Sequence, residues 1–142
     1  MTSKTDTWTT LRLLDWMSST FELKDIESPR LISEMLLTHV LGGQRIDLYA
    51  NVHRVTTDGE LGALRELVKR ALEHEPVQYL VGKTWFNGME FNVNPSTLIP
   101  RTCTETIVDQ VLARMDDTSE SFRVADIGTG SGCISISIAA NS

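Results

Sequence analysis

Three glycines that alternate with small polar residues stand near the end of the 142-residue chain, in the sequence Asp126-Ile127-Gly128-Thr129-Gly130-Ser131-Gly132. The runs on either side predict a buried strand over residues 122–127 and a helix over residues 133–140. A glycine-rich turn between a strand and a helix presents backbone N–H groups and a helix N-terminus to a ligand. The carboxylate of Asp126 suits a cation and is poorly placed to face a pyrophosphate.

The glycine spacing narrows the class of ligand. A dinucleotide-binding loop has the form GxGxxG, which would need glycine where this chain has Cys133. The form GxGxG with an acidic residue two positions before it resembles motif I of class I S-adenosylmethionine methyltransferases. In that motif the glycines let the cofactor lie against the backbone, and the acidic residue attracts its ammonium end. We therefore favour a methyltransferase over a dehydrogenase. A glycine-rich turn with a purely structural role is the alternative that the pattern leaves open.

Helices are predicted for the part of the chain that precedes this loop. Apolar residues at helical spacing predict a first helix over about residues 7–20. The pair Ser28-Pro29 predicts the start of a second helix, with Ser28 as its N-cap and Pro29 in its first turn. Gly42-Gly43 predicts the end of that helix, because glycine accepts the left-handed conformation of a C-terminal cap.

A third helix is predicted after Thr57, which forms a capping-box pattern with Glu60. Its apolar stripe continues to Leu72. One more short helical turn is expected over residues 77–81, ended by Gly82. Residues 1–82 are therefore predicted to form a small helical bundle.

The sequence changes character after residue 82. Two short strand-like runs surround Asn87-Gly88, the dipeptide that best fits a type I′ turn, and they predict a β-hairpin linker over residues 83–94. Residues 95–142 would then begin a Rossmann-like domain. Thr102 and Glu105 suggest a second capping box in front of a helix, and residues 116–120 suggest a loop. The predicted fold class is α/β overall.

Composition and charge limit the possible partners. A net charge of -6 and an isoelectric point near 5.0 argue against direct binding of nucleic acid through its phosphates. The polar N-terminus lacks the apolar stretch of a signal peptide, and no apolar run approaches the roughly 20 residues that span a bilayer. Cys103 and Cys133 have neither a CxxC nor a metal spacing, which suits a reducing compartment. We expect a cytoplasmic, soluble protein without membrane contact.

Three stretches together resemble one family, and they are SPRLISEMLLTHVLG, EPVQYLVGKTWFNGMEFNVNPSTLIPRTCTE and VADIGTGSGCISISIA. They resemble the PrmC/HemK family of glutamine N5-methyltransferases, in its order and spacing from about Pro29 to Ala140. The resemblance implies methyl transfer from S-adenosylmethionine to the side-chain amide nitrogen of the glutamine in the GGQ motif of peptide chain release factors. It also implies a set of cofactor-binding residues: Asp126, Gly128, Thr129, Gly130, Ser131 and Gly132.

The chain departs from the family pattern in two places. Pro100, Arg101, Thr104 and Glu105 match a family segment, but Thr102-Cys103 replaces its usual proline and acidic residue. The family's NPPY motif, which grips the substrate amide, does not occur in these 142 residues, and Asn94-Pro95 is best interpreted as a turn. Because this motif and the acidic residue that would hold the ribose are missing, we assign no catalytic residue and expect no activity from these residues alone.

The tripeptide Gly42-Gly43-Gln44 and the three histidines do not indicate a further site. Gly42-Gly43-Gln44 has the sequence of the GGQ tripeptide, but its glycines stand where a helix must end. His39, His53 and His74 share no ligand spacing, and we expect no metal site. The leading hypothesis is the N-terminal portion of a release factor glutamine methyltransferase. The alternatives are a non-catalytic protein-interaction module that docks a release factor, and a methyltransferase that acts on another protein or on an adenine amino group.

Overall fold

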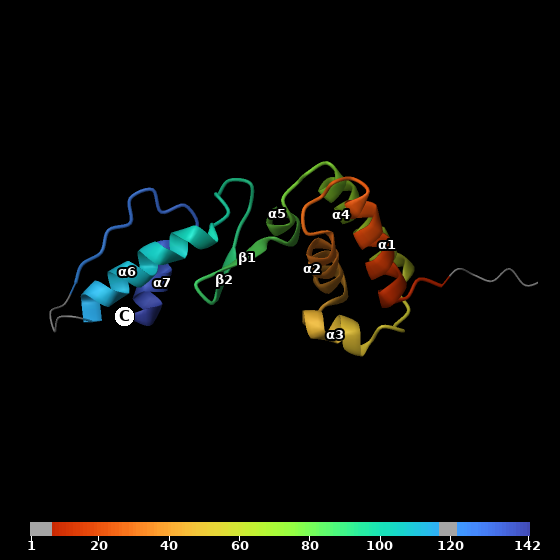
Figure 1. The fold of residues 1–142 in the computed structure, drawn as a ribbon, viewed down its shortest axis with the longest axis horizontal. Helices are drawn as coiled ribbons and strands as arrows, with labels where there is room; N and C mark the ends of the chain where they lie inside the picture. The colour runs from red at the N-terminus through yellow and green to blue at the C-terminus, as the bar shows by residue number, and fades with distance from the viewer. Residues whose placement is uncertain (1–6, 117–121) are drawn as a thin grey trace, which may run out of the picture. The chain divides into compact units, whose positions relative to one another are not determined.

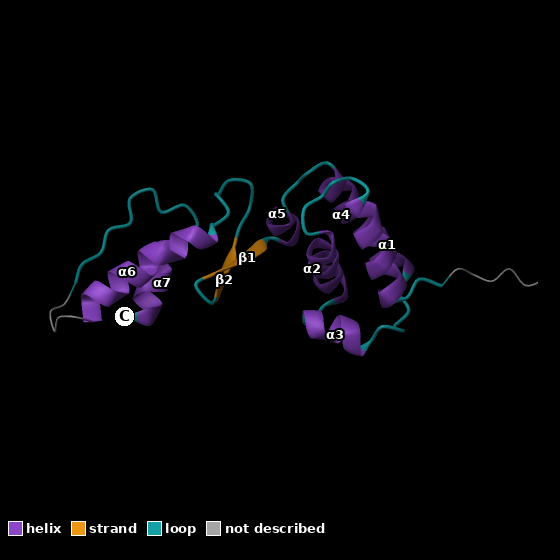
Figure 2. Cartoon of the chain, in the orientation of Figure 1, coloured by secondary structure: helices purple, strands orange, loops and turns teal. Residues whose placement is uncertain are grey.

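The computed structural model describes residues 7–116 and 122–142 (Figure 1). The chain forms two compact units that divide between Val81 and Gly82. Helices occur in both units, and within the described residues the strands form one two-stranded sheet (Figure 2). This mixture agrees with the predicted α/β class, whereas the Rossmann-like arrangement stays a prediction. None of the helices in the described part of the chain is long and apolar enough to cross a membrane.

The described part of the first unit is built from α1 (Thr10–Glu22), α2 (Pro29–Leu41), α3 (Arg45–Ala50), α4 (Asp58–Leu72) and α5 (Val77–Val81). These helices enclose one apolar core. The core consists of Leu13, Leu14, Met17, Phe21, Leu36, Leu37, Leu48, Leu64, Val68, Ala71, Val77, Leu80 and Val81. Burial of a large side chain such as Phe21, which is 0% exposed, stabilises the fold by roughly 1.5–3 kcal/mol.

The first helix begins later than its apolar pattern predicts. Thr9 is the N-cap of α1 and accepts a hydrogen bond from the Arg12 N–H at 3.4 Å. The cap and the residue before it pair with another segment: Thr9 forms an antiparallel bridge with Val55, and the Thr56 N–H donates to the Trp8 carbonyl at 3.0 Å. These backbone bonds hold Trp8 and Thr9 in an extended conformation, so the helix cannot include them.

The second helix begins at Pro29 as predicted, but Ser28 does not cap it. Ser28 adopts a left-handed conformation with φ of 55° and makes no side-chain capping bond. An N-cap serine that accepts from the first turn has an extended backbone, so the predicted capping mechanism is wrong here. The predicted end of the helix is confirmed, because Gly42 follows Leu41 with φ of 77°.

The short helix α3 was not predicted from the sequence. It has only six residues, of which Leu48 is buried, so its apolar pattern is too short to recognise. A local signal was present, since the Asp47 carboxylate accepts from the Gln44 N–H at 2.6 Å and closes the start of the helix. Gln44 of the Gly-Gly-Gln tripeptide therefore serves as the N-cap of α3.

The capping box of α4 is confirmed. The Glu60 N–H donates to the Thr57 hydroxyl at 3.3 Å, and the Thr57 N–H donates to the Glu60 carboxylate at 2.8 Å. Arg54 adds an ion pair with Glu60 at 2.6 Å. The short helix α5 and its terminating Gly82, with φ of 74°, are confirmed as well.

The second unit contains β1 (Lys83–Phe86), β2 (Met89–Asn92), the 3-10 helix η1 (Thr102–Thr104), α6 (Glu105–Asp116) and α7 (Cys133–Asn141). The two strands pair as the predicted antiparallel hairpin, and its turn residues Asn87 and Gly88 have φ of 48° and 73°. These values match a type I′ turn. The unit has its own core, made of Phe86, Phe91, Val108, Cys133 and Ile138.

Two predictions for this unit are wrong. Thr102 and Glu105 form no capping box, because α6 begins at Glu105 itself. Residues 122–127 form no strand. A strand needs a neighbour to pair with, and no segment among the described residues lies beside this one as a partner. The apolar Phe122, Val124 and Ile127 are exposed by 44%, 52% and 95%. Of the predicted loop over residues 116–120, Asp116 ends α6 and the rest lies outside the described residues.

Candidate functional site

The glycine loop adopts a conformation that requires its glycines. Gly128, Gly130 and Gly132 have φ of 79°, 57° and 79°, in the left-handed region that side chains disfavour. A Cβ atom at Gly128 would meet nothing within 4 Å, and one at Gly130 would meet only the Gly128 carbonyl at 4.0 Å. The space beside these two residues is therefore open, so a ligand can approach their backbone.

Asp126 connects the loop to the helix that follows it. One carboxylate oxygen, Oδ2, accepts from the Thr129 hydroxyl at 3.0 Å and from the Ser135 N–H at 3.3 Å. Ser135 lies in the first turn of α7, whose N-cap Gly132 has no side chain to offer. The carboxylate thus satisfies a free N–H group and adds negative charge at the positive end of the helix.

This contact was missed in the sequence because Asp126 and Ser135 are nine residues apart, well beyond the spacing of a local capping motif. The structure places all six predicted site residues in one loop, in which Asp126 contacts Thr129 and the turn from Thr129 to Gly132 includes Gly130 and Ser131. The Gly132 N–H closes the turn by donating to the Thr129 carbonyl at 2.9 Å. Ser131 is half-buried, and Thr129 is exposed.

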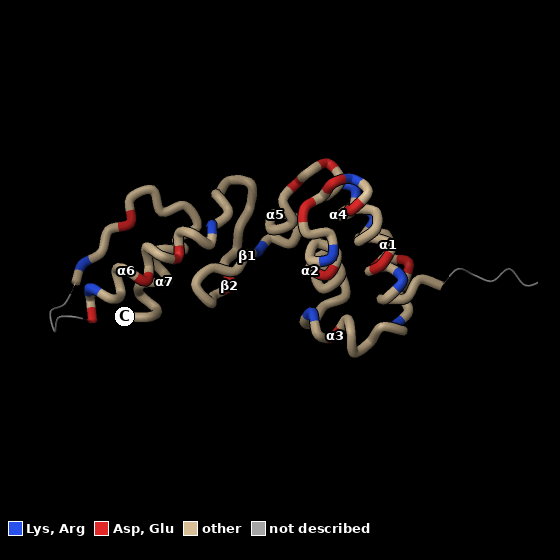
Figure 3. The backbone as a smooth tube through the Cα atoms, in the orientation of Figure 1, with Lys and Arg blue, Asp and Glu red and all other residues tan. Residues whose placement is uncertain are grey.

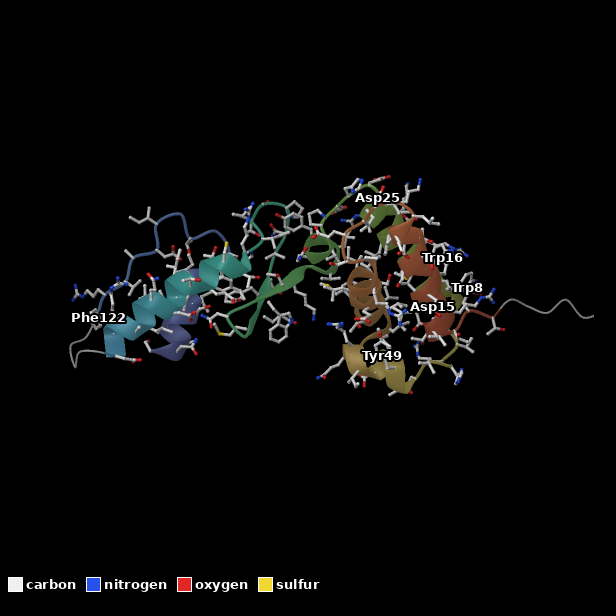
Figure 4. All side chains as sticks on the ribbon, in the orientation of Figure 1. Trp8, Asp15, Trp16, Asp25, Tyr49 and Phe122 are labelled. Carbon is white, nitrogen blue, oxygen red and sulfur yellow. The ribbon has the colours of Figure 1, made fainter. Side chains whose placement is uncertain are left out.

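A hollow of about 350 Å³ lies on the same unit. It is lined by Met115, Phe122, Val124, Ser135, Ile138, Ala139 and Ser142. Ser135 belongs both to this hollow and to the contacts of Asp126. Phe122, one of its lining residues, is labelled in Figure 4. The open backbone of the loop and its acidic side chain fit a ligand that carries positive charge and lies against glycine.

Glu105 has a structural role that its position in the sequence does not reveal. Its Oε1 accepts from the Asn87 N–H in the hairpin turn at 2.7 Å. Pro100 and Arg101 precede η1, and Thr102 and Cys103 are exposed in it. The segment that matches the family pattern therefore attaches the hairpin to α6.

A second polar cluster lies in the helical unit and was not identified from the sequence. The Glu34 side chain on α2 is only 4% exposed, and it accepts from Arg45 Nε at 2.8 Å and from the Tyr49 hydroxyl. Arg30 lies 3.6 Å from Glu34 and pairs with Asp15 on α1 at 2.9 Å. Asp15 and Tyr49 are labelled in Figure 4. The only sequence signal was the spacing of Arg30 and Glu34, one helical turn apart.

The electrostatics of Glu34 follow from this cluster. Burial raises the pKa of the Glu34 carboxyl, but hydrogen bonds from Tyr49 and Arg45 outweigh that effect, and the net pKa lies below the usual 4.5. The carboxylate is therefore charged at neutral pH. Since it joins α2 to α3, the cluster orders the helical unit. Within the described residues no group of three or more His, Cys, Asp or Glu side chains could hold a metal ion.

These features describe a helical domain followed by a β-hairpin and a glycine loop that opens a helix. Residues 12–82 match the PrmC N-terminal domain, and the chain belongs to this family.

Relatives match almost the whole chain. It is 42% identical to the release factor glutamine methyltransferase of Geobacter sulfurreducens, over 98% of this chain and 48% of that protein. It is 44% identical to the release factor glutamine methyltransferase of Rhodopirellula baltica, over 97% of this chain and 48% of the relative. The protein of the same name from Chlorobaculum tepidum is 40% identical over 93% of this chain and 46% of its own length. The chain thus spans about half the length of the curated relatives that it matches.

Proposed function

We propose that these residues supply the substrate-recognition domain and the cofactor loop of a release factor glutamine methyltransferase. The observation that carries this proposal is the identity of 40–44% with enzymes of that name, which extends through the helical unit, the hairpin and the glycine loop. The reaction would be methylation of the side-chain amide nitrogen of the glutamine in the GGQ motif of a peptide chain release factor. Its product would serve translation termination.

The glycine loop would hold S-adenosylmethionine. Gly128 and Gly130 leave their backbone open to a ligand, and Thr129, Ser131 and Gly132 complete the turn. Asp126 would attract the ammonium group of the cofactor while it keeps the start of α7 in place. When bound, the cofactor supplies the methyl group on its sulfonium. The residues of this chain would fix its position, which is how such an enzyme lowers the barrier.

The helical unit would recognise the release factor. Asp and Glu residues stand at several of its helix ends (Figure 3), which fits a protein partner better than the phosphates of a nucleic acid. We place the protein in the cytoplasm, since Cys103 and Cys133 are both free thiols, as in a reducing compartment. The chain contains no Asn-Pro-Pro-Tyr sequence, so we expect no methyl transfer by these 142 residues alone.

A chimera tests the proposal directly. The chain would replace the matching first half of the Geobacter sulfurreducens relative, and methylation of a release factor would be measured with S-adenosylmethionine that carries a labelled methyl group. We expect methylation by the chimera. A chimera that folds and binds the cofactor but does not methylate the release factor would contradict the proposal.

Two glycine variants of the chimera test the loop. Gly128→Ala should weaken cofactor binding. The φ of 79° at this position costs alanine about 1–2 kcal/mol, so the loop would no longer hold its conformation. Gly59→Ala is the matched control, since Gly59 lies inside α4 with nothing within 4 Å of an added Cβ. The control should bind S-adenosylmethionine as well as the parent chimera does. If both variants bound S-adenosylmethionine equally well, the loop would not be part of the cofactor site.

A second candidate function is docking of a release factor without chemistry. The family match over residues 12–82 favours it, because that range covers the helical unit and stops before the hairpin. Titration calorimetry of the 142-residue chain separates the two. Binding of a release factor without binding of S-adenosylmethionine would support the docking module, whereas binding of both would support the cofactor loop as well.

A further inference from the structure

The helical unit has a hollow of about 470 Å³ between two helix ends. One wall is the turn that follows α1, where Asp25 is labelled in Figure 4, and the other is the turn between α4 and α5. The hollow is lined by Asp25, Ile26, Glu27, Ser28, Leu31, Ile32, Met35, Ala71, His74, Glu75, Pro76, Val77 and Gln78. All of these residues belong to the first unit.

Both walls are fixed by the same type of helix ending. After α1, Asp25 is left-handed with φ of 53°, and the Ile26 N–H donates back to the Phe21 carbonyl at 3.0 Å. After α4, His74 is left-handed with φ of 63°, and the Glu75 N–H donates back to the Arg70 carbonyl at 3.2 Å. Each is the six-to-one bond of a Schellman motif, so the two walls have a defined shape.

The floor of the hollow is apolar. Leu31 on α2 is 41% exposed, although α2 otherwise turns its apolar side chains toward the core. Ile32 and Met35 are partly buried beside it, and Val77 is buried at the start of α5. A large apolar side chain from another molecule could contact Leu31 here and remove its surface from water.

The rim of the hollow is negative. It carries the carboxylates of Asp25, Glu27 and Glu75, and no Lys or Arg is among its lining residues. Glu75 is neutralised by Arg70, whose Nε lies 2.7 Å from it. Asp25 and Glu27 make no ion pair within residues 7–116 and 122–142. The rim therefore keeps an excess of negative charge next to an exposed leucine.

We propose that this hollow binds a basic segment of the protein substrate, with a large apolar side chain on Leu31 and a Lys or Arg beside Asp25 and Glu27. The inference rests on the proposed function, because it takes the segment from a release factor. The acidic rim favours a segment with positive charge. The apolar floor favours a segment that also carries a large apolar side chain.

Calorimetric titration of a release factor into the 142-residue chain tests the proposal. The double variant Asp25→Asn, Glu27→Gln removes two charges and keeps the fold, since asparagine tolerates the left-handed conformation at position 25. We expect this variant to bind the release factor with a Kd at least about fivefold higher than that of the unchanged chain. Leu31→Ala should weaken binding by about tenfold. The control, Glu66→Gln with Asp109→Asn, removes the same charge from exposed positions outside the hollow and should leave the Kd unchanged.

The outcomes separate this proposal from the proposed function. If the release factor binds the unchanged chain and both hollow variants as tightly as the control, the hollow is not the site, while the function stands. If the release factor does not bind the unchanged chain, the proposed recognition of the release factor is contradicted. A second probe then tests whether the hollow binds a basic segment.

That second probe is a hexapeptide with two leucines among four lysines. Its titration should shift the amide resonances of residues 25–28 and 74–78 in an NMR spectrum, and the shifts should be lost in the double variant and kept in the control. Shifts spread evenly over the acidic residues of the chain would overturn the proposal.

Discussion

At the scale of single residues, Glu34 is the most constrained charge in the helical unit. Its carboxylate has almost no contact with water, and Arg45 and Tyr49 replace the hydrogen bonds that water would provide. A buried charge that loses one partner is costly, whereas an exposed pair such as Arg30 with Asp15 contributes little. The stability of the cluster should therefore depend on Glu34 more than on Asp15.

We predict that Glu34→Gln lowers the free energy of unfolding by about 1.5–3 kcal/mol at pH 7, because it removes charge-assisted hydrogen bonds. Urea denaturation of the 142-residue chain measures the change. The control Asp15→Asn, at a side chain that is 61% exposed, should cost less than about 1 kcal/mol. A loss as large in the control as in Glu34→Gln would contradict this view of the cluster.

The same variant should change the response to acid. The folded-state pKa of Glu34 lies below its unfolded value near 4.5, so the folded chain binds fewer protons at this site. The stability that Glu34 contributes is complete above about pH 4.5 and is lost as the pH falls through the folded-state pKa. The difference in unfolding free energy between the parent chain and Glu34→Gln should therefore shrink below pH 4.5. A difference that stays constant down to pH 3 would show that Glu34 stabilises by packing alone.

At the scale of elements, two sequence patterns between residues that are neighbours in the chain were reliable. Asn87-Gly88 predicted the hairpin because the turn is set by the φ preferences of those two residues. Thr57 and Glu60 predicted a cap because the bonds span three residues. The same pattern failed at Thr102, since the carboxylate of Glu105 finds a partner 18 residues away.

We predict that Glu105→Ala loosens the hairpin turn. The Asn87 N–H would lose its acceptor, at a cost of about 1–3 kcal/mol if no water replaces it. Amide hydrogen exchange at Asn87 measures this effect and should become faster. The control is Glu90→Ala, which removes an exposed ion pair of the hairpin with Lys83, 2.9 Å apart. Faster exchange at Asn87 in the control alone would refute the role of Glu105.

At the scale of the whole molecule, the two units have separate cores. The core that includes Phe21 and Leu36 and the core that includes Phe86 and Val108 share no residue. Apolar periodicity predicted the first core well, because helices bury one stripe along their length. Apolar periodicity failed for residues 122–127. A strand forms only beside a partner strand, and an apolar pattern does not tell whether such a partner is present.

We predict that residues 1–82 fold without the rest of the chain, since the first core lies entirely within them. The NMR amide spectrum of that segment should overlay on the spectrum of the 142-residue chain, except next to the new end. Collapsed or poorly dispersed resonances would mean that the helical unit needs the hairpin to fold.

The three tryptophans divide between these units in a way that spectroscopy can use. Trp8 and Trp16 meet edge to face in the helical unit, with their ring centroids 5.9 Å apart, and exciton coupling between two indole rings this close gives a circular dichroism couplet in the far ultraviolet. Trp85 stands alone on β1 with 67% of its surface exposed, where a dissolved quencher such as iodide can reach it. Each unit thus contains tryptophan, so indole fluorescence reports on the surroundings of both the bundle and the hairpin without any added dye.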